Sequence, residues 1–405
     1  MIIDKRKETT KFLENSTIDN ACRFNGDTRC KKFFSLIDKN PNQSKLVNDL
    51  VNIMSGKMFQ FRFGPRRIDK DKEKELSGFF GENDFIKIFE SSFTSPVYMI
   101  NNIINQKQEL ANVIGVEEEQ ISRMISDTSV LYSRFFIWKD KEKTKKRWIE
   151  APNKELKDIQ KKILNNIIYK FHATKFAHGF IHNRSIVSCA KEHTGKKFVL
   201  KLDIKNFFPS ITREMVYGAM YDDINAENIK YIVPAIEMCL LDGRLPQGAP
   251  TSPAISNIVC RNLDLLLSGV IKCLGFEISY TRYADDLIFS SNDDKIYRII
   301  PIIKKLVTKF GFIVNEKKVK VLKSHQRQTV TGLVVNCPGK TSVRRRTRMN
   351  LRAYMHQIII GKKPIENVNI NKLRGDVNII VMANPQQGKW FKDKFDTIIE
   401  MYNNR

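Results

Sequence analysis

The sequence lacks any apolar run of about 18 residues or more, the length a membrane-spanning helix requires. Its opening segment, MIIDKRKETTK, also lacks the apolar core of a signal peptide. No internal repeat and no low-complexity linker occurs. We therefore expect a folded cytoplasmic protein with no membrane partner.

Cysteine is sparse and unclustered. The seven cysteines stand at positions 22, 30, 189, 239, 260, 273 and 337, and no two of them form a CxxC motif. No group of cysteines and histidines has the ligand spacing of a zinc site. We expect reduced thiols and no structural zinc ion.

Acidic residues are scarce relative to basic ones. Lysine and arginine total 69 and aspartate and glutamate 44, which gives a formal net charge of +25 over 405 residues. The hydrophobic content of 42% is ordinary for a folded protein, so the excess charge does not come from a disordered basic tail. A folded protein this basic usually binds a polyanion, and nucleic acid is the first candidate.

Four regions differ in their patterns. Residues 1–92 mix short helical patterns with "KMFQFRFGPRR", where phenylalanines alternate as on a half-buried strand. Residues 93–197 are mostly helical around a basic, hairpin-like stretch, "WKDKEKTKKRWIEAP". Strands and helices alternate over residues 198–340, and residues 341–405 are basic and mostly helical. This mixture predicts an α+β protein.

Two adjacent aspartates interrupt a pair of apolar strands. "FEISYTRY" and "DLIFSS" predict a β-hairpin with Asp285 and Asp286 at or beside its turn. A third carboxylate, Asp203, follows the aliphatic run "FVLKL". Neighbouring carboxylates repel, and a divalent cation such as Mg²⁺ would relieve that repulsion. Taken alone, the Asp285–Asp286 pair also fits a solvated turn.

The order of four motifs resembles the palm of reverse transcriptases. They are "KLDIKNFFPSI", "LPQGAPTSPAISNIV", "YADD" and "GFIVNEKKVKV", and the resemblance covers roughly residues 95–395. Retron enzymes are the most similar subgroup, through "VTG" at Val330–Gly332 and "CAKEH" at Cys189–His193. Cys189 stands where the retron motif NAxxH has its asparagine.

This resemblance implies a right-hand polymerase. Residues 93–197 would form the fingers, 198–340 the palm and 341–405 the thumb, and 1–92 would be an N-terminal extension of unknown role. Two Mg²⁺ ions, or Mn²⁺ in their place, would be held by Asp203, Asp285, Asp286 and the carbonyl group of Ile204. Lys318 would be the catalytic acid, with Lys317 as the near-equal choice.

The resemblance also assigns residues to the deoxynucleoside triphosphate. These are Arg147, Phe208, Gln247, Gly248 and Tyr283. Arg147 would grip the triphosphate or belong to a solvated basic face. Phe208 would lie beneath the sugar and exclude a 2′-hydroxyl, or it would be core together with Phe207. The Gln247–Gly248 turn would approach the nucleotide closely, or it would be an ordinary loop.

RNA contacts are expected at two places. His193 would contact the retron's own RNA or be a structural histidine at a helix end. The arginine-rich thumb segment would hold the template–primer duplex, or form a solvated basic helix, through Arg344, Arg345, Arg346 and Arg348.

The function implied is that of a bacterial retron reverse transcriptase. It would copy part of a structured noncoding RNA into a branched RNA–DNA hybrid, msDNA, primed by a guanosine 2′-hydroxyl. Such systems usually act in defence against phage with a separate effector protein. The alternatives are a group II intron-like or other defence-associated reverse transcriptase, and a non-catalytic RNA-binding scaffold. The short stretch after Arg344 disfavours the group II alternative, and the intact carboxylate trio disfavours the scaffold.

Overall fold

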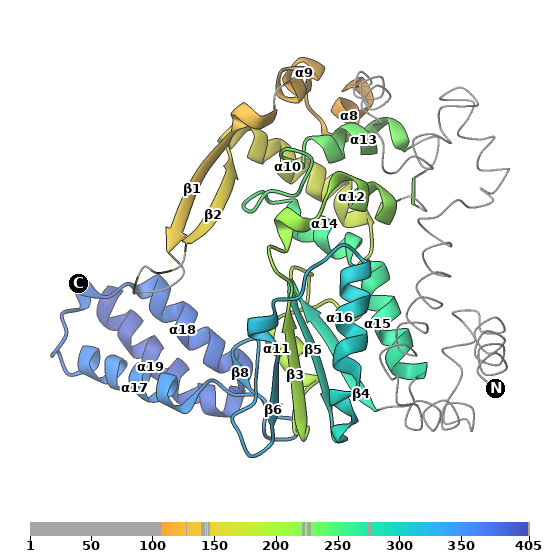
Figure 1. The fold of residues 1–405 in the computed structure, drawn as a ribbon. Coiled ribbons are helices and arrows are strands. Elements are labelled where there is room, and N and C mark those ends of the chain that lie inside the picture. The colour runs from red at the N-terminus through yellow and green to blue at the C-terminus, as the bar shows by residue number, and fades with distance from the viewer. Residues whose placement is uncertain are drawn as a thin grey trace, which may run out of the picture. The chain divides into compact units, whose positions relative to one another are not determined.

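The computed structural model describes residues 107–403 apart from 127, 139–141, 143, 145, 221–222, 225–227 and 274–276. These residues form two compact units that alternate along the chain (Figure 1). The first unit contains described residues up to 175, those of 204–275 and 300–314, and the second contains 176–203, those of 276–299 and 315–403. The predicted N-terminal extension and its alternating phenylalanines lie outside the described residues. The boundaries proposed at 93, 198 and 341 stay predictions.

The second unit contains a four-stranded antiparallel sheet in the order β4-β5-β3-β6. The strands are β3 (Phe198–Asp203), β4 (Ile278–Tyr283), β5 (Asp286–Ser291) and β6 (Lys320–Lys323). The two central strands, β3 and β5, are mostly buried, as their aliphatic sequences require. The two residues Ala284 and Asp285 join β4 to β5, and Ala284 adopts a left-handed φ of 53°. The predicted hairpin and the α+β class are confirmed.

Helix α11 (Ile186–Lys191) and a short hairpin pack beside this sheet. Ser185 caps the helix by accepting hydrogen bonds from the backbone of Val187 and Ser188. The hairpin consists of β7 (Thr329–Val330) and β8 (Leu333–Val334). The segment "TVTGLVVN" therefore does not form one continuous strand. The chain reverses at Thr331 and Gly332, whose φ values are 47° and 87°, a turn that glycine makes possible.

The C-terminal part of the second unit is a three-helix bundle (Figure 1), which agrees with the prediction that this region is mostly helical. Its helices are α17 (Arg345–Ile359), α18 (Ile370–Ala383) and α19 (Pro385–Asn403). Leu351, Met355, Val377, Phe391 and Ile398 are among the buried residues that these helices contribute to a shared core. Burial of this apolar stripe stabilises the bundle, and α17 is its strongly basic helix, with four arginines and no acidic residue.

The first unit combines helices with one hairpin. Strands β1 (Tyr132–Trp138) and β2 (Lys146–Pro152) pair antiparallel, which confirms the predicted basic hairpin. The helices are α8 (Lys107–Ile114), α9 (Glu118–Ser126), α10 (Lys154–Asn166), α12 (Arg213–Met220), α13 (Ile229–Glu237), α14 (Ser252–Val259), α15 (Arg261–Cys273) and α16 (Ile299–Lys309), the last beginning at the unit boundary.

No single helix in the described part of the chain is long and apolar enough to cross a membrane. One pair, Ser252–Val259 with Arg261–Lys272, meets the length and composition criterion only when its two members are joined, and it bends by 41° between them.

Candidate active site

Three carboxylates meet at one end of the β3–β5 ladder in the second unit. Asp203 ends β3 and lies directly opposite Asp286, the first residue of β5. Asp285 precedes Asp286 in the hairpin turn. Residues opposite each other on paired strands have their Cβ atoms about 5 Å apart. The fold therefore brings together carboxylates that are more than 80 positions apart in the sequence.

Their proximity disturbs the ionisation of two of these groups. Burial, the negative charge of Asp286 and that of Asp203 raise the pKa of Asp285 to about 6. Burial, together with the charge of Asp203, also raises the pKa of Asp286, although Lys201 acts in the opposite direction. Two half-buried acids thus carry negative charge that the protein compensates incompletely. This is the environment in which a cation is stabilised.

The third acid, Asp203, is engaged by neighbouring polar groups. The Lys318 ammonium donates to Asp203 Oδ2 at 2.5 Å and the Asn315 amide to Oδ1 at 3.2 Å. Partial burial lowers the pKa of Lys318, but the hydrogen bond to Asp203 and the charges of all three aspartates raise it by more. The pKa of Lys318 is therefore higher than usual. Of the two lysines left open by the sequence, Lys318 therefore reaches the carboxylates. Its service as an acid stays a prediction.

The donor chemistry fits a hard divalent cation, since all three side chains offer carboxylate oxygens. In the present side-chain arrangement, however, the described residues include no group of three His, Cys, Asp or Glu side chains close enough to hold a metal ion. In this arrangement the Asp203 carboxylate is bonded to Lys318 and Asn315. Metal binding at Asp203, Ile204, Asp285 and Asp286 stays a prediction.

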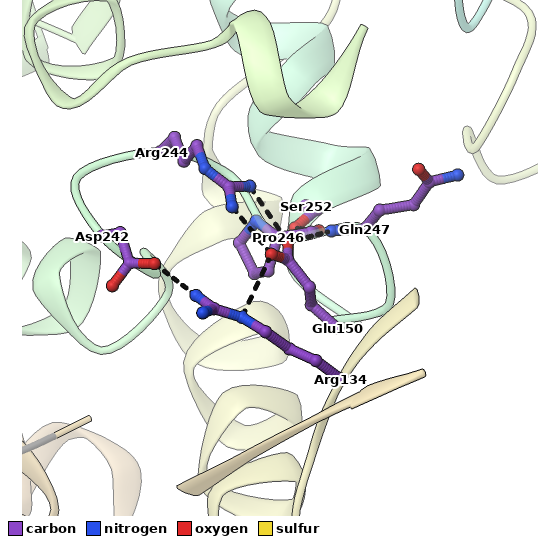
Figure 2. Close-up of polar contacts among 7 residues, drawn as sticks. All are labelled: Arg134, Glu150, Asp242, Arg244, Pro246, Gln247 and Ser252. Carbon is purple, nitrogen blue, oxygen red and sulfur yellow. Dashed lines mark hydrogen bonds and ion pairs between the residues drawn. The ribbon is translucent and has the colours of Figure 1, made fainter. Parts of the chain in front are cut away.

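A second cluster of charge lies in the first unit and holds the "LPQG" loop. Glu150 on β2 is only 7% exposed, and both of its oxygens accept hydrogen bonds from Arg244, at 2.7 and 3.0 Å. Arg134 Nε lies 3.6 Å from the same carboxylate and its guanidinium also pairs with Asp242. Figure 2 shows both guanidinium groups directed toward Glu150.

The backbone completes this attachment. The Glu150 amide donates to the carbonyl of Gln247 at 2.9 Å, and Ser252 donates to the carbonyl of Pro246 at 2.7 Å. Gly248 has a φ of 151°, and a Cβ there would lie 2.6 Å from the Glu150 carbonyl oxygen. Glycine is thus required by the neighbouring strand of this chain, and close approach of a nucleotide stays a prediction. The Gln247 side chain is directed away from the cluster (Figure 2).

Comparison with known proteins identifies the family. A family model described as "Reverse transcriptase (RNA-dependent DNA polymerase)" matches residues 138–335. The chain is 32% identical over 252 residues to the Retron Ec83 reverse transcriptase of Escherichia coli, covering 59% of this chain and 79% of that relative. The chain belongs to the retron reverse transcriptases. It is also 34% identical over 296 residues to the Retron Mx162 reverse transcriptase of Myxococcus xanthus, covering 65% of this chain and 60% of that relative.

This retron reverse transcriptase therefore spans 60% of the length of its Mx162 relative. Among solved structures, a telomerase from Candida albicans, in complex with a fragment of telomeric RNA, aligns at a TM-score of 0.39 and 14% identity. That alignment covers 66% of this chain and 56% of that one, and the family assignment does not depend on it.

The prediction that His193 contacts RNA is wrong in this structure. Its side chain is fully buried, and both ring nitrogens are bonded within the second unit, to Ser290 and Thr281 at 2.7 Å each. Its backbone amide donates to the Ala190 carbonyl at the end of α11. The alternative of a structural histidine at a helix end is the one that this retron reverse transcriptase adopts.

The predicted arginines lie at the start of α17. Arg344, Arg345 and Arg346 are exposed, whereas Arg348 is half-buried and donates to Gln387 and to the Val343 carbonyl. Cations at a helix N-terminus are disfavoured by the helix dipole, so a bound polyanion would stabilise this arrangement. RNA binding there stays a prediction.

The remaining predicted residues occupy different environments. Arg147 is exposed on β2, opposite Ile137. Phe207 is core at 6% exposure, and Phe208 beside it is half-buried with their ring centroids 5.4 Å apart. Tyr283 is half-buried and pairs with Asp286 across the hairpin. The roles predicted for Arg147, Phe208 and Tyr283 stay predictions.

Sequence reasoning missed Glu150 and Arg244, which fix the "LPQG" loop. The available signal was a lone glutamate following four basic residues in "KTKKRWIEAP" and an arginine just before the loop. Nothing in the linear pattern indicated that these two, 94 positions apart, form a bidentate pair.

Proposed function

We propose that this chain is an RNA-directed DNA polymerase that extends a primer hydroxyl with deoxynucleotides on an RNA template. One observation carries the proposal: Asp203 and Asp286 are register partners, and Asp285 in the adjoining turn has a pKa raised to about 6 by burial and by these neighbours. Placing such groups together destabilises the metal-free protein, so their presence is explained by a cationic ligand.

Asp203, Asp285 and Asp286 would hold Mg²⁺, with the Ile204 carbonyl as a further ligand. When bound, such ions activate the attacking hydroxyl and neutralise charge on the leaving pyrophosphate. The Lys318 ammonium, held on Asp203 at 2.5 Å, would be released to donate a proton to the pyrophosphate. Arg147 and Gln247 would orient the nucleotide, and Phe208 would select its sugar.

The cognate substrate would be a structured noncoding RNA that is copied in part into branched msDNA, primed from a guanosine 2′-hydroxyl. The net charge of +25 and the exposed arginines at the start of α17 support binding of such an RNA. A role in phage defence with a separate effector protein belongs to the same proposal.

Primer extension on an RNA template with Mg²⁺ and labelled deoxynucleotides tests the polymerase assignment. A purified wild-type chain that extends no primer would favour the RNA-binding scaffold instead. Sequencing the nucleic acid that copurifies with the chain tests the retron substrate. A short DNA joined to an internal guanosine is expected, and linear DNA alone would favour another reverse-transcriptase lineage.

A further inference from the structure

One imidazole ring bonds both strands of the hairpin that carries two of the carboxylates. His193 Nδ1 lies 2.7 Å from Ser290 Oγ, on β5, and Nε2 lies 2.7 Å from Thr281 Oγ1, on β4. The turn between these strands contains Asp285, and Asp286 begins β5. The geometry of the carboxylate pair therefore depends on strands that His193 joins from the side.

The strand register places these contacts on the face of the sheet that bears the acids. Asp286, Ile288 and Ser290 alternate along β5 and so project from one face. Thr281 lies opposite Ile288 on β4 and shares that face. Ile288 packs in a buried cluster with residues of α11. Helix α11 thus covers the part of this face beyond Asp286. Polar contacts there come from Cys189 of the helix, whose Sγ lies 3.2 Å from Thr281 Oγ1, and from His193 just after it.

The ring can satisfy both hydroxyl groups at once. Burial lowers the pKa of His193 to about 3, so the ring is neutral, with one donor nitrogen and one acceptor nitrogen. A hydroxyl can donate or accept, so Thr281 and Ser290 complement either tautomer. A buried polar network that is fully satisfied holds its members in one arrangement.

The helix that precedes His193 is itself fixed to the β7–β8 hairpin. Thr331 of the "VTG" turn donates to the Ile186 carbonyl at the start of α11, at 2.8 Å. After the helix, the Gly195 amide donates to the Val335 carbonyl at 2.8 Å. A Cβ on Gly195 would lie 2.7 Å from Pro338. Both ends of α11 are therefore anchored, and the backbone at His193 is held in place.

We infer that His193 is a positioning residue that holds β4 and β5 together and so sets the placement of Asp285 and Asp286. The segments "CAKEH" and "VTG" then act jointly on the hairpin, one through the imidazole and the other by anchoring its helix. The kinetic part of this inference rests on the proposed polymerase function, whereas the structural part does not.

Conservative substitutions of the two hydroxyls test the inference with a matched control. Thr281→Val and Ser290→Ala each remove one partner of His193 and leave the ring in place. Thr341→Val is the control, because Thr341 is as buried as Thr281, at 2% exposure, but donates to the Ala383 carbonyl at the end of α18. Thermal unfolding of all three variants establishes that they fold, and Ser290→Ala suffices should Thr281→Val not fold.

The first measurement is steady-state primer extension. We expect kcat to fall about tenfold in Thr281→Val and in Ser290→Ala, the effect of one unsatisfied buried hydrogen bond. The KM for deoxynucleotide and the affinity for template RNA should stay within about twofold of wild type, as should every parameter of Thr341→Val. Loss of RNA affinity with unchanged kcat would overturn the inference.

The second measurement needs no activity. Hydrogen exchange in the metal-free chain, followed on a peptide covering 279–291, should be at least about tenfold faster in Thr281→Val and Ser290→Ala than in wild type or Thr341→Val. Equal exchange in all four proteins would overturn the positioning role even if the enzyme is active. If exchange is faster in Thr281→Val and Ser290→Ala than in wild type, but the wild-type chain extends no primer, the positioning role is kept and the polymerase is rejected.

Discussion

Two clusters of charge, one in each unit, treat their carboxylates in opposite ways. In the first unit Glu150 receives two hydrogen bonds from Arg244 and lies close to Arg134. In the second unit Asp286 is the register partner of Asp203, Asp285 precedes it in the turn, and both Asp285 and Asp286 have raised pKa values. A compensated carboxylate holds a loop in place, while incompletely compensated ones indicate that a ligand supplies the missing charge.

The largest expected effect comes from removing a charge in the uncompensated cluster. Asp285→Asn should lower the rate of primer extension on the order of a thousandfold, because a cation ligand is lost. Binding of template RNA should remain nearly intact, since the substitution leaves the basic surfaces unchanged. Both quantities can be measured by single-turnover extension and by filter binding.

Asp242→Asn provides the control for this variant. Asp242 is exposed and pairs only at the surface of the first unit with Arg134, so its loss should change extension less than about threefold. Equal losses of RNA binding and extension in Asp285→Asn would mean that this carboxylate does not act through a cation.

Low pH should lower the stability of the protein through His193, a buried group that the fold keeps neutral. The pKa of His193 is lowered to about 3 by burial, and an unfolded histidine titrates near 6.5. Because the folded pKa is the lower one, the stabilising contribution is complete above pH 6.5 and declines as pH falls toward 3. Between pH 7 and pH 5 the free energy of unfolding should fall by about 2 kcal/mol from this residue alone.

Urea unfolding at pH 7, 6 and 5 measures this dependence. Between pH 7 and pH 5 the free energy of unfolding of His193→Asn should fall by about 2 kcal/mol less than that of wild type, because the variant lacks the titrating group. An unchanged slope would mean that His193 is protonated, or accessible to water, in the folded chain.

Removing charge from the compensated cluster should destabilise the fold, the reverse of what is expected at Asp285. Glu150→Gln leaves Arg244 partly buried without its anionic partner, at a cost of about 2 kcal/mol in the free energy of unfolding. Metal-free Asp285→Asn should instead be more stable than wild type at pH 7, because it removes a half-buried charge that Asp203 and Asp286 repel. Urea unfolding of both variants in the presence of a metal chelator measures the two changes in the free energy of unfolding. Changes of the same sign would contradict the difference proposed between the two clusters.

The sequence predicted the uncompensated cluster far better than the compensated one. Asp203, Asp285 and Asp286 interrupt apolar strands, so their linear context already marked them as anomalous. Glu150 and Arg244 each lie within three residues of another charged residue, Arg147 and Asp242, and nothing in the sequence distinguishes a buried pair from solvated charges. His193 was read as an RNA contact because its motif identified it, whereas its burial is set by the packing of α11 and depends on tertiary structure. The sequence did not separate β7 from β8, because the β-branched and apolar residues of "TVTGLVVN" are also typical of a single strand.

An aromatic pair in the first unit, Phe207 and Phe208, offers an uncharged comparison between a residue that holds the fold and one expected to contact the substrate. The smallest expected effect on activity comes from this pair. Phe207 is core and packs 5.9 Å from the Phe312 ring, whereas Phe208 is half-buried. Phe208→Ala should raise ribonucleotide incorporation relative to deoxynucleotide by about tenfold, since the ring that excludes the 2′-hydroxyl is lost. Competition between the two nucleotide types in primer extension measures this ratio.

Phe207→Ala is the matched control, because it removes the same side chain from the adjacent position. It should lower the free energy of unfolding by about 3 kcal/mol through the cavity that it leaves, with sugar selectivity unchanged. If Phe207→Ala relaxed selectivity and Phe208→Ala did not, the buried ring would govern the sugar indirectly. The degree of burial would then not distinguish residues that stabilise the fold from residues that contact the substrate.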